Sequence, residues 1–364
     1  MFLKKKNQQK RLKRFRSRNH RKKGEEILPF FILTYNLVVK KRALVTGVSG
    51  MDGSHLAEHL LSLGYEVYGT VRFSSNLHNI KNSKDKINLL YGDITDANFI
   101  YKSILESQPD EIYHIAAISF SSEIWTNPLS TYQIDAISVV QFLEAIKNIN
   151  PKIKFLTCSS SEIYDVISGG IDENTPANPI SPYGISKLFA QNNIKMYRDK
   201  FGIYCCSAIL FNHESERRSK NFVTKKISSG IANVYLKSTE KLVFGDITAK
   251  KDWGYSPEFV DAMQRMLQID EPEDFILATQ SLVSVQEIIE HGFKYINISN
   301  WQDYIEIDQK FTKNRVNKEI YGIIDKAKQK LNWTPQTSIL SAIEKMIDFD
   351  IVETKESNKI FIVM

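Results

Sequence analysis

The chain has 364 residues, of which 42% are hydrophobic, so it is long enough for one large α/β domain with an appended lobe, or for two domains, around a buried core. Its net charge of +6 is unevenly spread, because residues 1–23 carry 12 Lys and Arg and no acid, which leaves 36 basic against 42 acidic side chains in residues 24–364. This acidic body excludes a broad nucleic-acid-binding surface, although local basic residues could still hold a nucleotide.

The basic residues belong to a tail, which we place at residues 1–36. The tail could be a nucleic-acid-binding arm, a targeting segment or translated upstream sequence without a function, and we expect disorder because a block of like charges cannot pack. The apolar run 27–39 has no small-residue cleavage site after it and is too short to span a bilayer. We therefore expect a soluble, cytoplasmic protein.

From residue 42 to about residue 211, strand-like runs alternate with helix-like runs. This pattern predicts an α/β fold with a Rossmann-type, doubly wound parallel sheet covered by helices on both faces. The expected strands are 42–46, 65–71, 87–92, 111–117, 152–160 and 203–211. The expected helices are one from about Gly53 to Gly64, an amphipathic stretch over 128–149 and one near 182–200. The thiols of Cys158, Cys205 and Cys206 lack disulfide or metal spacing, so we expect buried thiols and no metal site.

Beyond Asn212 the pattern becomes irregular and predicts a smaller, discontinuous α/β C-terminal lobe for the substrate. The elements expected there are helices near 221–237, 257–268 and 284–291, a strand at 241–245, and two helices around a turn at Trp333–Pro335. The resulting domain assignment is a dinucleotide-binding domain at 37–211 with segments near 252–280 returning to it, a substrate lobe at 212–251 and 281–349, and a tail at 350–364.

Three glycines, Gly47, Gly50 and Gly53, follow the first strand and lead into a helix. Glycine lets the backbone turn tightly and approach a pyrophosphate at the positive end of the helix, so this G-x-x-G-x-x-G spacing predicts a dinucleotide site. A tight strand–helix turn without a ligand is the alternative. Met51 and Asp52 lie within the same loop and are included in the predicted site.

The ends of the later strands complete the predicted cofactor site. Arg72 stands after the second strand, where an NAD-binding protein would often place an acid, and a guanidinium there would hold a 2′-phosphate. We therefore favour NADP over NAD, with a solvated surface arginine as the alternative. Asp93 and Ile94 follow the third strand at the adenine, and Ala116 and Ala117 follow the fourth against the cofactor.

Tyr183 and Lys187 lie four residues apart and share one face of a predicted helix. A phenol is a poor base at neutral pH, but a nearby ammonium and an oxidised nicotinamide would favour the phenolate. Because this pair follows the glycine loop within alternating strands and helices, we predict that Tyr183 removes a proton from an alcohol as its hydride goes to NADP, and that both residues also contact the cofactor.

At this point the sequence resembles the extended short-chain dehydrogenases/reductases, and more narrowly the GDP-mannose 4,6-dehydratase family. The resemblance covers residues 41–347 and is carried by stretches such as "TGVSGMDGSHLAEHLL", "SPYGISKLFA" and "ILFNHESERRSKNFVTKKI". It implies conversion of GDP-mannose to GDP-4-keto-6-deoxymannose with a bound NADP that is reduced and then reoxidised. It also implies that Glu162, in "CSSSEIY", removes the C5 proton, and that Ser160, where the family has threonine, keeps the hydroxyl of the proton relay.

For the nucleotide sugar, the resemblance implies a contact between Ser119 and the hexose. It places a cationic and polar set around the diphosphate, as a doubly charged group requires, or at a neighbouring subunit: Asn212, Arg218 and Lys226. Lys251 stands where the family has arginine, which reduces a bidentate contact to a single one. Arg315 or Lys313 is the candidate for a further diphosphate ligand, in a segment that matches the family poorly.

Other departures affect the cofactor and the assembly. Met51 replaces a glutamine of the family's loop, and Phe73 stands where many members have a second arginine, which weakens the preference for NADP. The family also implies a homodimer or homotetramer, formed through a helical bundle and the cofactor loop, which is short here at residues 72–86.

Two other classes of function remain open at this stage. A GDP-sugar reductase, an epimerase or a GDP-heptose 4,6-dehydratase would use the same scaffold, and a reductase would consume external NADPH. A non-catalytic nucleotide-sugar-binding scaffold would be free to lose Tyr183, Lys187 or Glu162, and all three are present.

Overall fold

The structure is a computed structural model that describes residues 40–119, 121–164, 166, 168–237, 240–308, 310 and 319–363, without the side chains of 121–123 and 357–363. The predicted basic tail at 1–36 and the apolar run at 27–39 lie outside the described residues. From Lys40 onward the chain forms one compact unit. In this part of the chain no helix is both long enough and apolar enough to cross a membrane.

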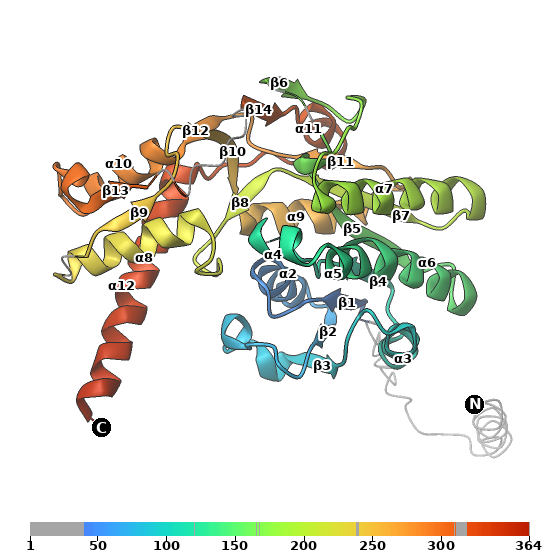
Figure 1. The fold of residues 1–364 in the computed structure, drawn as a ribbon. Helices are drawn as coiled ribbons and strands as arrows, with labels where there is room; N and C mark the ends of the chain where they lie inside the picture. The colour runs from blue at the N-terminus through green and yellow to red at the C-terminus, as the bar shows by residue number, and fades with distance from the viewer. Residues whose placement is uncertain are drawn as a thin grey trace, which may run out of the picture. The chain divides into compact units, whose positions relative to one another are not determined.

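A parallel sheet of seven strands forms the centre of the unit, in the order β11-β7-β5-β4-β1-β2-β3 (Figure 1). Its strands are β1 (Arg42–Thr46), β2 (Glu66–Val71), β3 (Ile87–Tyr91), β4 (Glu111–His114), β5 (Lys154–Ser160), β7 (Cys205–Leu210) and β11 (Phe275–Leu277). The order reverses direction between β1 and β4, which is where doubly wound sheets open a crevice at the carboxyl ends of their strands. This arrangement confirms the predicted Rossmann-type fold.

Both faces of this sheet are buried, because successive residues of a strand point to opposite sides. On β1, Ala43 and Val45 belong to one apolar core and Leu44 to the other. The first core lies under α2 (Met51–Ser62), α9 (Ser256–Met266) and α11 (Asp325–Leu331). The second lies under α3 (Ala97–Ser107), α6 (Ser138–Ile149) and α7 (Pro182–Phe201).

The start of α7 is fixed by local sequence signals. Pro182 occupies the first turn, where a missing N–H costs nothing, and the Ser181 hydroxyl accepts a hydrogen bond from the Gly184 N–H at 3.0 Å. The helix ends at Gly202, which takes a left-handed conformation with φ of 64°. Tyr183 is thereby held in the first turn, at the edge of the sheet where the carboxyl ends of the strands lie.

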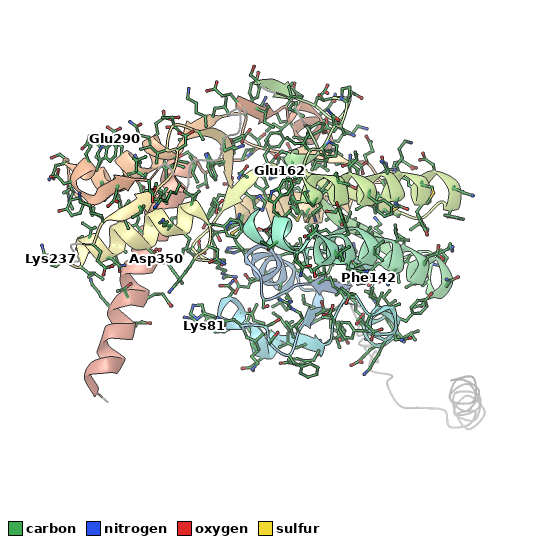
Figure 2. The ribbon with its side chains drawn as sticks, viewed as in Figure 1. Lys81, Phe142, Glu162, Lys237, Glu290 and Asp350 are labelled. Atoms are coloured by element: carbon green, nitrogen blue, oxygen red, sulfur yellow. The ribbon has the colours of Figure 1, made fainter. Side chains whose placement is uncertain are left out.

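A smaller lobe packs around a third core formed by α8 (Val223–Tyr235), α10 (Val285–Tyr295) and α12 (Ile339–Val363). Its strands are β8 (Asn212–Glu214), β9 (Leu242–Phe244), β10 (Lys250–Tyr255), β12 (Leu282–Ser284) and β13 (Ile305–Ile307). A further pair joins β6 (Ser168–Ile171) to β14 (Glu319–Gly322). Within the lobe, buried Asp350 on α12 accepts a hydrogen bond from Lys225 on α8 at 2.5 Å, and Figure 2 shows Asp350 beside that helix.

Two predicted segments differ from the structure. Residues 350–363 of the predicted tail continue α12, and Ile347 and Asp350 keep this helix packed on the lobe. The stretch at 128–149 is divided into α5 (Pro128–Tyr132), a π-helical turn at Gln133–Ile137, and α6. The two C-terminal helices and the turn between them are as predicted.

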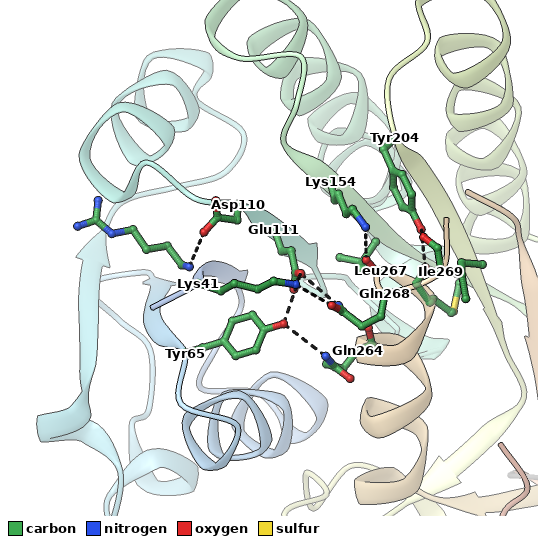
Figure 3. Close-up of polar contacts among 12 residues, drawn as sticks. Lys41, Tyr65, Asp110, Glu111, Lys154, Tyr204, Gln264, Leu267, Gln268 and Ile269 are labelled. Carbon is green, nitrogen blue, oxygen red and sulfur yellow. Dashed lines mark hydrogen bonds and ion pairs between the residues drawn. The ribbon is translucent and has the colours of Figure 1, made fainter. Parts of the chain in front are cut away.

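The amino end of the sheet is closed by a polar network around Glu111, the first residue of β4 (Figure 3). Glu111 is buried, and its two carboxylate oxygens accept from Tyr113 Oη at 2.7 Å, Lys41 Nζ at 3.0 Å and Gln268 Nε2 at 3.1 Å. A buried carboxylate with this many donors is stabilised, so the network joins β4 to α9 and to the start of β1.

Candidate active site

A cavity of about 520 Å³ opens at the carboxyl ends of the central strands. These ends are level with one another, because Thr46 of β1 pairs with His114 of β4, which pairs with Thr157 of β5. Most of the residues predicted from the sequence line this cavity: Gly47, Gly50, Met51, Asp52, Gly53, Arg72, Asp93, Ile94, Ala116, Ala117, Ser119, Ser160, Glu162, Tyr183, Lys187, Asn212 and Arg218. Residues far apart in sequence are thus brought to one site, as predicted.

The glycine loop has the geometry that a dinucleotide requires. Gly47 has φ of 64°, and a Cβ there would lie 3.0 Å from the Ala116 Cα. A Cβ at Gly53 would lie 2.3 Å from the Gly47 carbonyl oxygen, so only glycine allows the loop to fold back on the start of α2. The backbone N–H groups at this helix end face the cavity region where an anion is favoured, so the loop fits a nicotinamide dinucleotide.

The groups predicted to carry the chemistry converge on the same cavity. Tyr183 and Lys187 lie on consecutive turns of α7, with the Lys187 ammonium 5.3 Å from the Tyr183 ring centre. Ser160 ends β5, and its hydroxyl accepts a hydrogen bond from the Glu162 N–H at 3.2 Å. A Cβ at Gly184 would lie 2.3 Å from the Glu162 carbonyl oxygen, so the glycine lets α7 approach the turn that carries Glu162.

The carboxylate of Glu162 is exposed to this cavity. In Figure 2 the residue lies between the helices around the sheet and those of the smaller lobe. Tyr183 and Glu162 therefore face one cavity from two elements. Two acid/base groups in one cavity are what successive proton transfers on a bound molecule need.

The pKa of Tyr183 is higher than its predicted role as a base requires. Burial raises the pKa of Tyr183 to about 12, and the neighbouring Lys187 ammonium offsets this only in part. Burial alone would lower the pKa of Lys187, but Asp135 and Tyr183 outweigh it, and the pKa lies above its ordinary value. In the chain by itself, Tyr183 is therefore a phenol at neutral pH, and further positive charge or loss of negative charge is needed to make it a base.

Asp135 was missed in the sequence. It lies in the π-helical turn, is 1% exposed, and its Oδ1 lies 3.5 Å from Lys187 Nζ. Burial raises the pKa of Asp135 to about 6, although Lys187 acts in the opposite direction. The only signal available was an acid within an apolar helical stretch, which by itself is more often a surface residue.

The residues predicted to contact the adenosine part of a cofactor, Arg72, Asp93 and Ile94, line the cavity. Arg72 is exposed just after β2, and its backbone N–H donates to Ser75 Oγ at 3.0 Å. The Asp93 carboxylate accepts from the N–H and hydroxyl of Thr95, both at 2.9 Å, and Ile94 is buried beside it. These contacts fix the loops after β2 and β3 in place.

Asp52 has a second role that the sequence did not indicate. Its carboxylate accepts from His213 Nε2 at 3.0 Å and from Ser256 Oγ at 2.6 Å. The other ring nitrogen of His213 bonds to the Phe211 carbonyl oxygen at 2.8 Å, which can only accept, so both nitrogens carry protons. Burial would lower the pKa of His213, but Asp52 raises it above its usual value. This ion pair joins the glycine loop to β8 of the smaller lobe.

The predicted substrate ligands are only partly brought together. Ser119 and Asn212 are exposed on the cavity. Arg218 also lines it, with its guanidinium 3.5 Å from the Phe222 ring centre and its Nε 3.0 Å from Glu214 Oε2. Its charge is therefore partly balanced by a buried carboxylate before any phosphate arrives.

Two predicted ligands, Lys226 and Lys251, do not line this cavity, and a third lies outside the described residues. Lys226 does not line it, because its ammonium donates to the Val243 carbonyl and lies 5.0 Å from the Phe244 ring centre. Lys251 instead lines an adjoining cavity of about 10 Å³, beside Glu162 and Asn212. Arg315 and its alternative, Lys313, lie outside the described residues.

Comparison with known proteins extends over both lobes. The family model of GDP-mannose 4,6 dehydratase matches residues 44–346. GDP-mannose 4,6 dehydratase of Homo sapiens is 38% identical over 339 residues, which cover 85% of this chain and 91% of that protein. GDP-mannose 4,6 dehydratase 1 of Arabidopsis thaliana is 36% identical over 328 residues, which cover 86% of this chain and 90% of that protein. The solved structure of dTDP-glucose 4,6-dehydratase from Bacillus anthracis, in complex with NAD, matches with a TM-score of 0.75 at 20% identity and covers 87% of this chain and 98% of that one.

Proposed function

Because this chain belongs to the GDP-mannose 4,6-dehydratase family, we propose that it converts GDP-mannose to GDP-4-keto-6-deoxymannose in the cavity described above. The observation that carries this proposal is the convergence of Ser160, Glu162, Tyr183 and Lys187 on the cavity that the glycine loop also lines. The overall reaction is the loss of one water from the sugar, so it consumes no external reductant.

Tyr183 acts on the C4 hydroxyl of the sugar. As a phenolate it takes the hydroxyl proton, and the Lys187 ammonium stabilises the negative charge on the phenolate. We assign the Ser160 hydroxyl to a hydrogen bond with the same region of the sugar, because it also lines the cavity. A bound nicotinamide cofactor supplies the acceptor for the hydrogen that leaves C4 and the donor of the hydrogen that reaches C6.

Glu162 carries out the elimination. The C4 ketone acidifies the C5 proton, and the exposed carboxylate of Glu162 takes that proton and gives one to the departing C6 hydroxyl, which leaves as water. C5 regains a proton at the end, and Tyr183, which holds the proton from the C4 hydroxyl, is the donor. Protons and oxygen therefore balance with Glu162 and Tyr183 restored to their starting states.

The cofactor we propose is NADP. Gly47, Gly53 and the start of α2 form the pyrophosphate cradle, and Arg72 lies on the cavity where a 2′-phosphate would meet it. Phe73 provides no second guanidinium and is 85% exposed, stacked on Tyr91 at 5.4 Å. Arg72 alone therefore supports NADP over NAD in this proposal.

The substrate's diphosphate meets polar rather than strongly cationic groups. We assign Asn212 and Arg218 to it and Ser119 to the hexose, since all three line the cavity. Lys226, Lys251 and Arg315 remain predicted ligands, and a contribution from Lys226 would require its ammonium to leave the Val243 carbonyl.

We propose a homo-oligomer that covers the outer face of α7. Apolar side chains of Ile185, Phe189 and Met196 are exposed there at helical spacing, and Leu129 of the adjacent α5 is 74% exposed. An exposed apolar stripe on a two-helix face is self-complementary about a two-fold axis. Light scattering should give a dimer or tetramer for the wild type and a smaller species for Phe189→Glu, whereas the same mass for both would contradict this interface.

Free, buried Cys158, Cys205 and Cys206 are consistent with a cytoplasmic location.

The activity is tested by incubating the purified holoprotein with GDP-mannose and following the mass of the nucleotide sugar. We expect a product that has lost one water, formed without net oxidation of added NADPH. Consumption of NADPH in step with turnover would indicate the reductase instead, and no product from a protein with bound cofactor would refute the proposal.

A further inference from the structure

The strongest unassigned feature of the site is the buried carboxylate of Asp135. Its Oδ1 accepts a hydrogen bond from the Ile118 N–H at 3.1 Å and lies 3.5 Å from Lys187 Nζ. Its Oδ2 is buried and has no hydrogen-bond partner among the residues that the structure describes. Buried carboxylates normally have both oxygens satisfied, so this group is held in an environment that does not favour its charge.

The backbone around Asp135 is also unusual. The π-helical turn Gln133–Ile137 interrupts the helical path from α5 to α6, and such turns occur mostly at functional sites. It places Asp135 against α7, on the same side as Lys187. The π-helical turn therefore directs the Asp135 side chain toward Lys187.

We propose that Asp135 is a positioning residue that holds Lys187 beside Tyr183 and, by gaining or losing a proton, determines whether Tyr183 is a phenol or a phenolate. With Asp135 ionised, its charge balances that of Lys187 and the phenol is favoured. With Asp135 protonated, the Lys187 charge is free to stabilise a phenolate. Only O–H bonds change, and each group gains its proton from the solvent or loses it to the solvent.

Two other buried titratable groups near the pair, His114 and Cys158, keep one charge state near neutral pH. Burial lowers the pKa of His114 on β4 to about 3, which keeps the imidazole neutral between Thr46 and Ser138. Burial raises the pKa of Cys158 on β5 to about 12, so the thiol stays protonated. Glu162 faces the pair from the open cavity. Burial raises the pKa of Asp135 to about 6, which is closer to neutrality than the pKa of His114 or of Cys158.

This inference rests on the proposed function, in which Tyr183 is the base. Its test measures only the ionisation of Tyr183 and does not require that activity. The phenolate of Tyr183 is measured by ultraviolet difference titration of the holoprotein, with the Tyr183→Phe variant subtracted. Asp135→Asn keeps the size of the side chain and removes its charge, so we expect the phenolate to form at a pH lower by about one unit or more, which is at least about tenfold more phenolate at a given pH below the midpoint. Asp135→Glu, which keeps the charge, should titrate like the wild type.

A matched control is Glu111→Gln, which alters a buried lysine-paired carboxylate at the opposite end of the sheet and should leave the Tyr183 titration unchanged. If Asp135→Asn does not fold, Asp135→Ser is titrated in the same way. An Asp135→Asn titration that coincides with the wild type would overturn the proposal, as would an Asp135→Glu titration shifted as far as that of Asp135→Asn. The titration requires no GDP-mannose, so a protein that made no product would refute the proposed activity while still testing Asp135.

Discussion

Two buried carboxylates are paired with lysines in this fold, Glu111 at the amino end of β4 and Asp135 in the π-helical turn, and the two pairs are built differently. At the amino end, Glu111 lies 3.0 Å from Lys41 and accepts a hydrogen bond from Gln268 (Figure 3). It also accepts one from Tyr113. Beyond the carboxyl end, Asp135 faces Lys187 at 3.5 Å and has one further donor, the Ile118 N–H.

The difference matches a structural role for Glu111 and the positioning role that we propose for Asp135. A buried charge whose oxygens are all engaged keeps one protonation state and adds stability. A buried charge with an oxygen left unsatisfied costs stability, and it can change its proton state at little further cost. We therefore expect substitutions at the two ends to affect different measurements.

The largest effect is expected from Tyr183→Phe at the cavity end. Loss of the only proposed base for the C4 hydroxyl should reduce product formation by about 10³-fold. The fold should be as stable as the wild type, because the ring and its packing remain. Product formation and the urea midpoint are measured on the same preparation. Activity within tenfold of the wild type would remove Tyr183 from its proposed role.

The opposite pattern is expected for Glu111→Ala at the amino end. The buried Tyr113 hydroxyl and the Gln268 amide lose their acceptor, which should cost about 3 kcal/mol of unfolding free energy. Activity per folded molecule should not change, since Glu111 lies at the far end of the sheet. Urea denaturation and activity below the transition give the two values. A Glu111→Ala variant with wild-type stability and reduced activity would contradict the structural role of Glu111.

Glu162→Gln should reduce product formation by about 10²-fold while leaving stability unchanged, because Glu162 is exposed. Since Tyr183 and Lys187 are untouched, C4 oxidation should continue and a 4-keto sugar that retains its C6 oxygen should accumulate. Mass spectrometry of the quenched reaction distinguishes this species from the product. If the variant instead made product at the wild-type rate, another group would perform the elimination.

The smallest effect is expected from Arg72→Ala at the edge of the cavity. Removal of one exposed guanidinium should weaken NADP binding by about tenfold and leave NAD binding nearly unchanged. Calorimetric titration of both cofactors with the apoprotein gives the ratio. Equal weakening for the two cofactors would show that Arg72 does not contact the 2′-phosphate.

Much of the fold and of the site followed from local patterns. The strands were visible as apolar runs, and the glycines at 47, 50 and 53 indicated the cradle because their spacing reflects a local turn. Tyr183 and Lys187 were found because helical spacing places residues four apart on one face. Each of these features is determined by residues that lie close together in the sequence, so it can be recognised before the fold is known.

The features that were missed depend on contacts between distant segments. Asp135 meets Lys187 only because a π-helical turn breaks a regular helix, and His213 meets Asp52 only after β8 packs on the glycine loop. Lys226 carried the right charge, but the direction of its side chain is determined by Phe244 and the Val243 carbonyl. The length of α12 was underestimated because the buried Asp350 that anchors it reads as a surface acid.

The central claim is that one hydrogen moves within a single sugar molecule while water is lost. It is tested most directly with GDP-mannose that carries deuterium at C4, incubated with the wild-type holoprotein and unlabelled NADP. The account predicts GDP-4-keto-6-deoxymannose with the deuterium at C6, formed without net change in the cofactor. A product without deuterium at C6, or deuterium that accumulates in free NADPH, would contradict it.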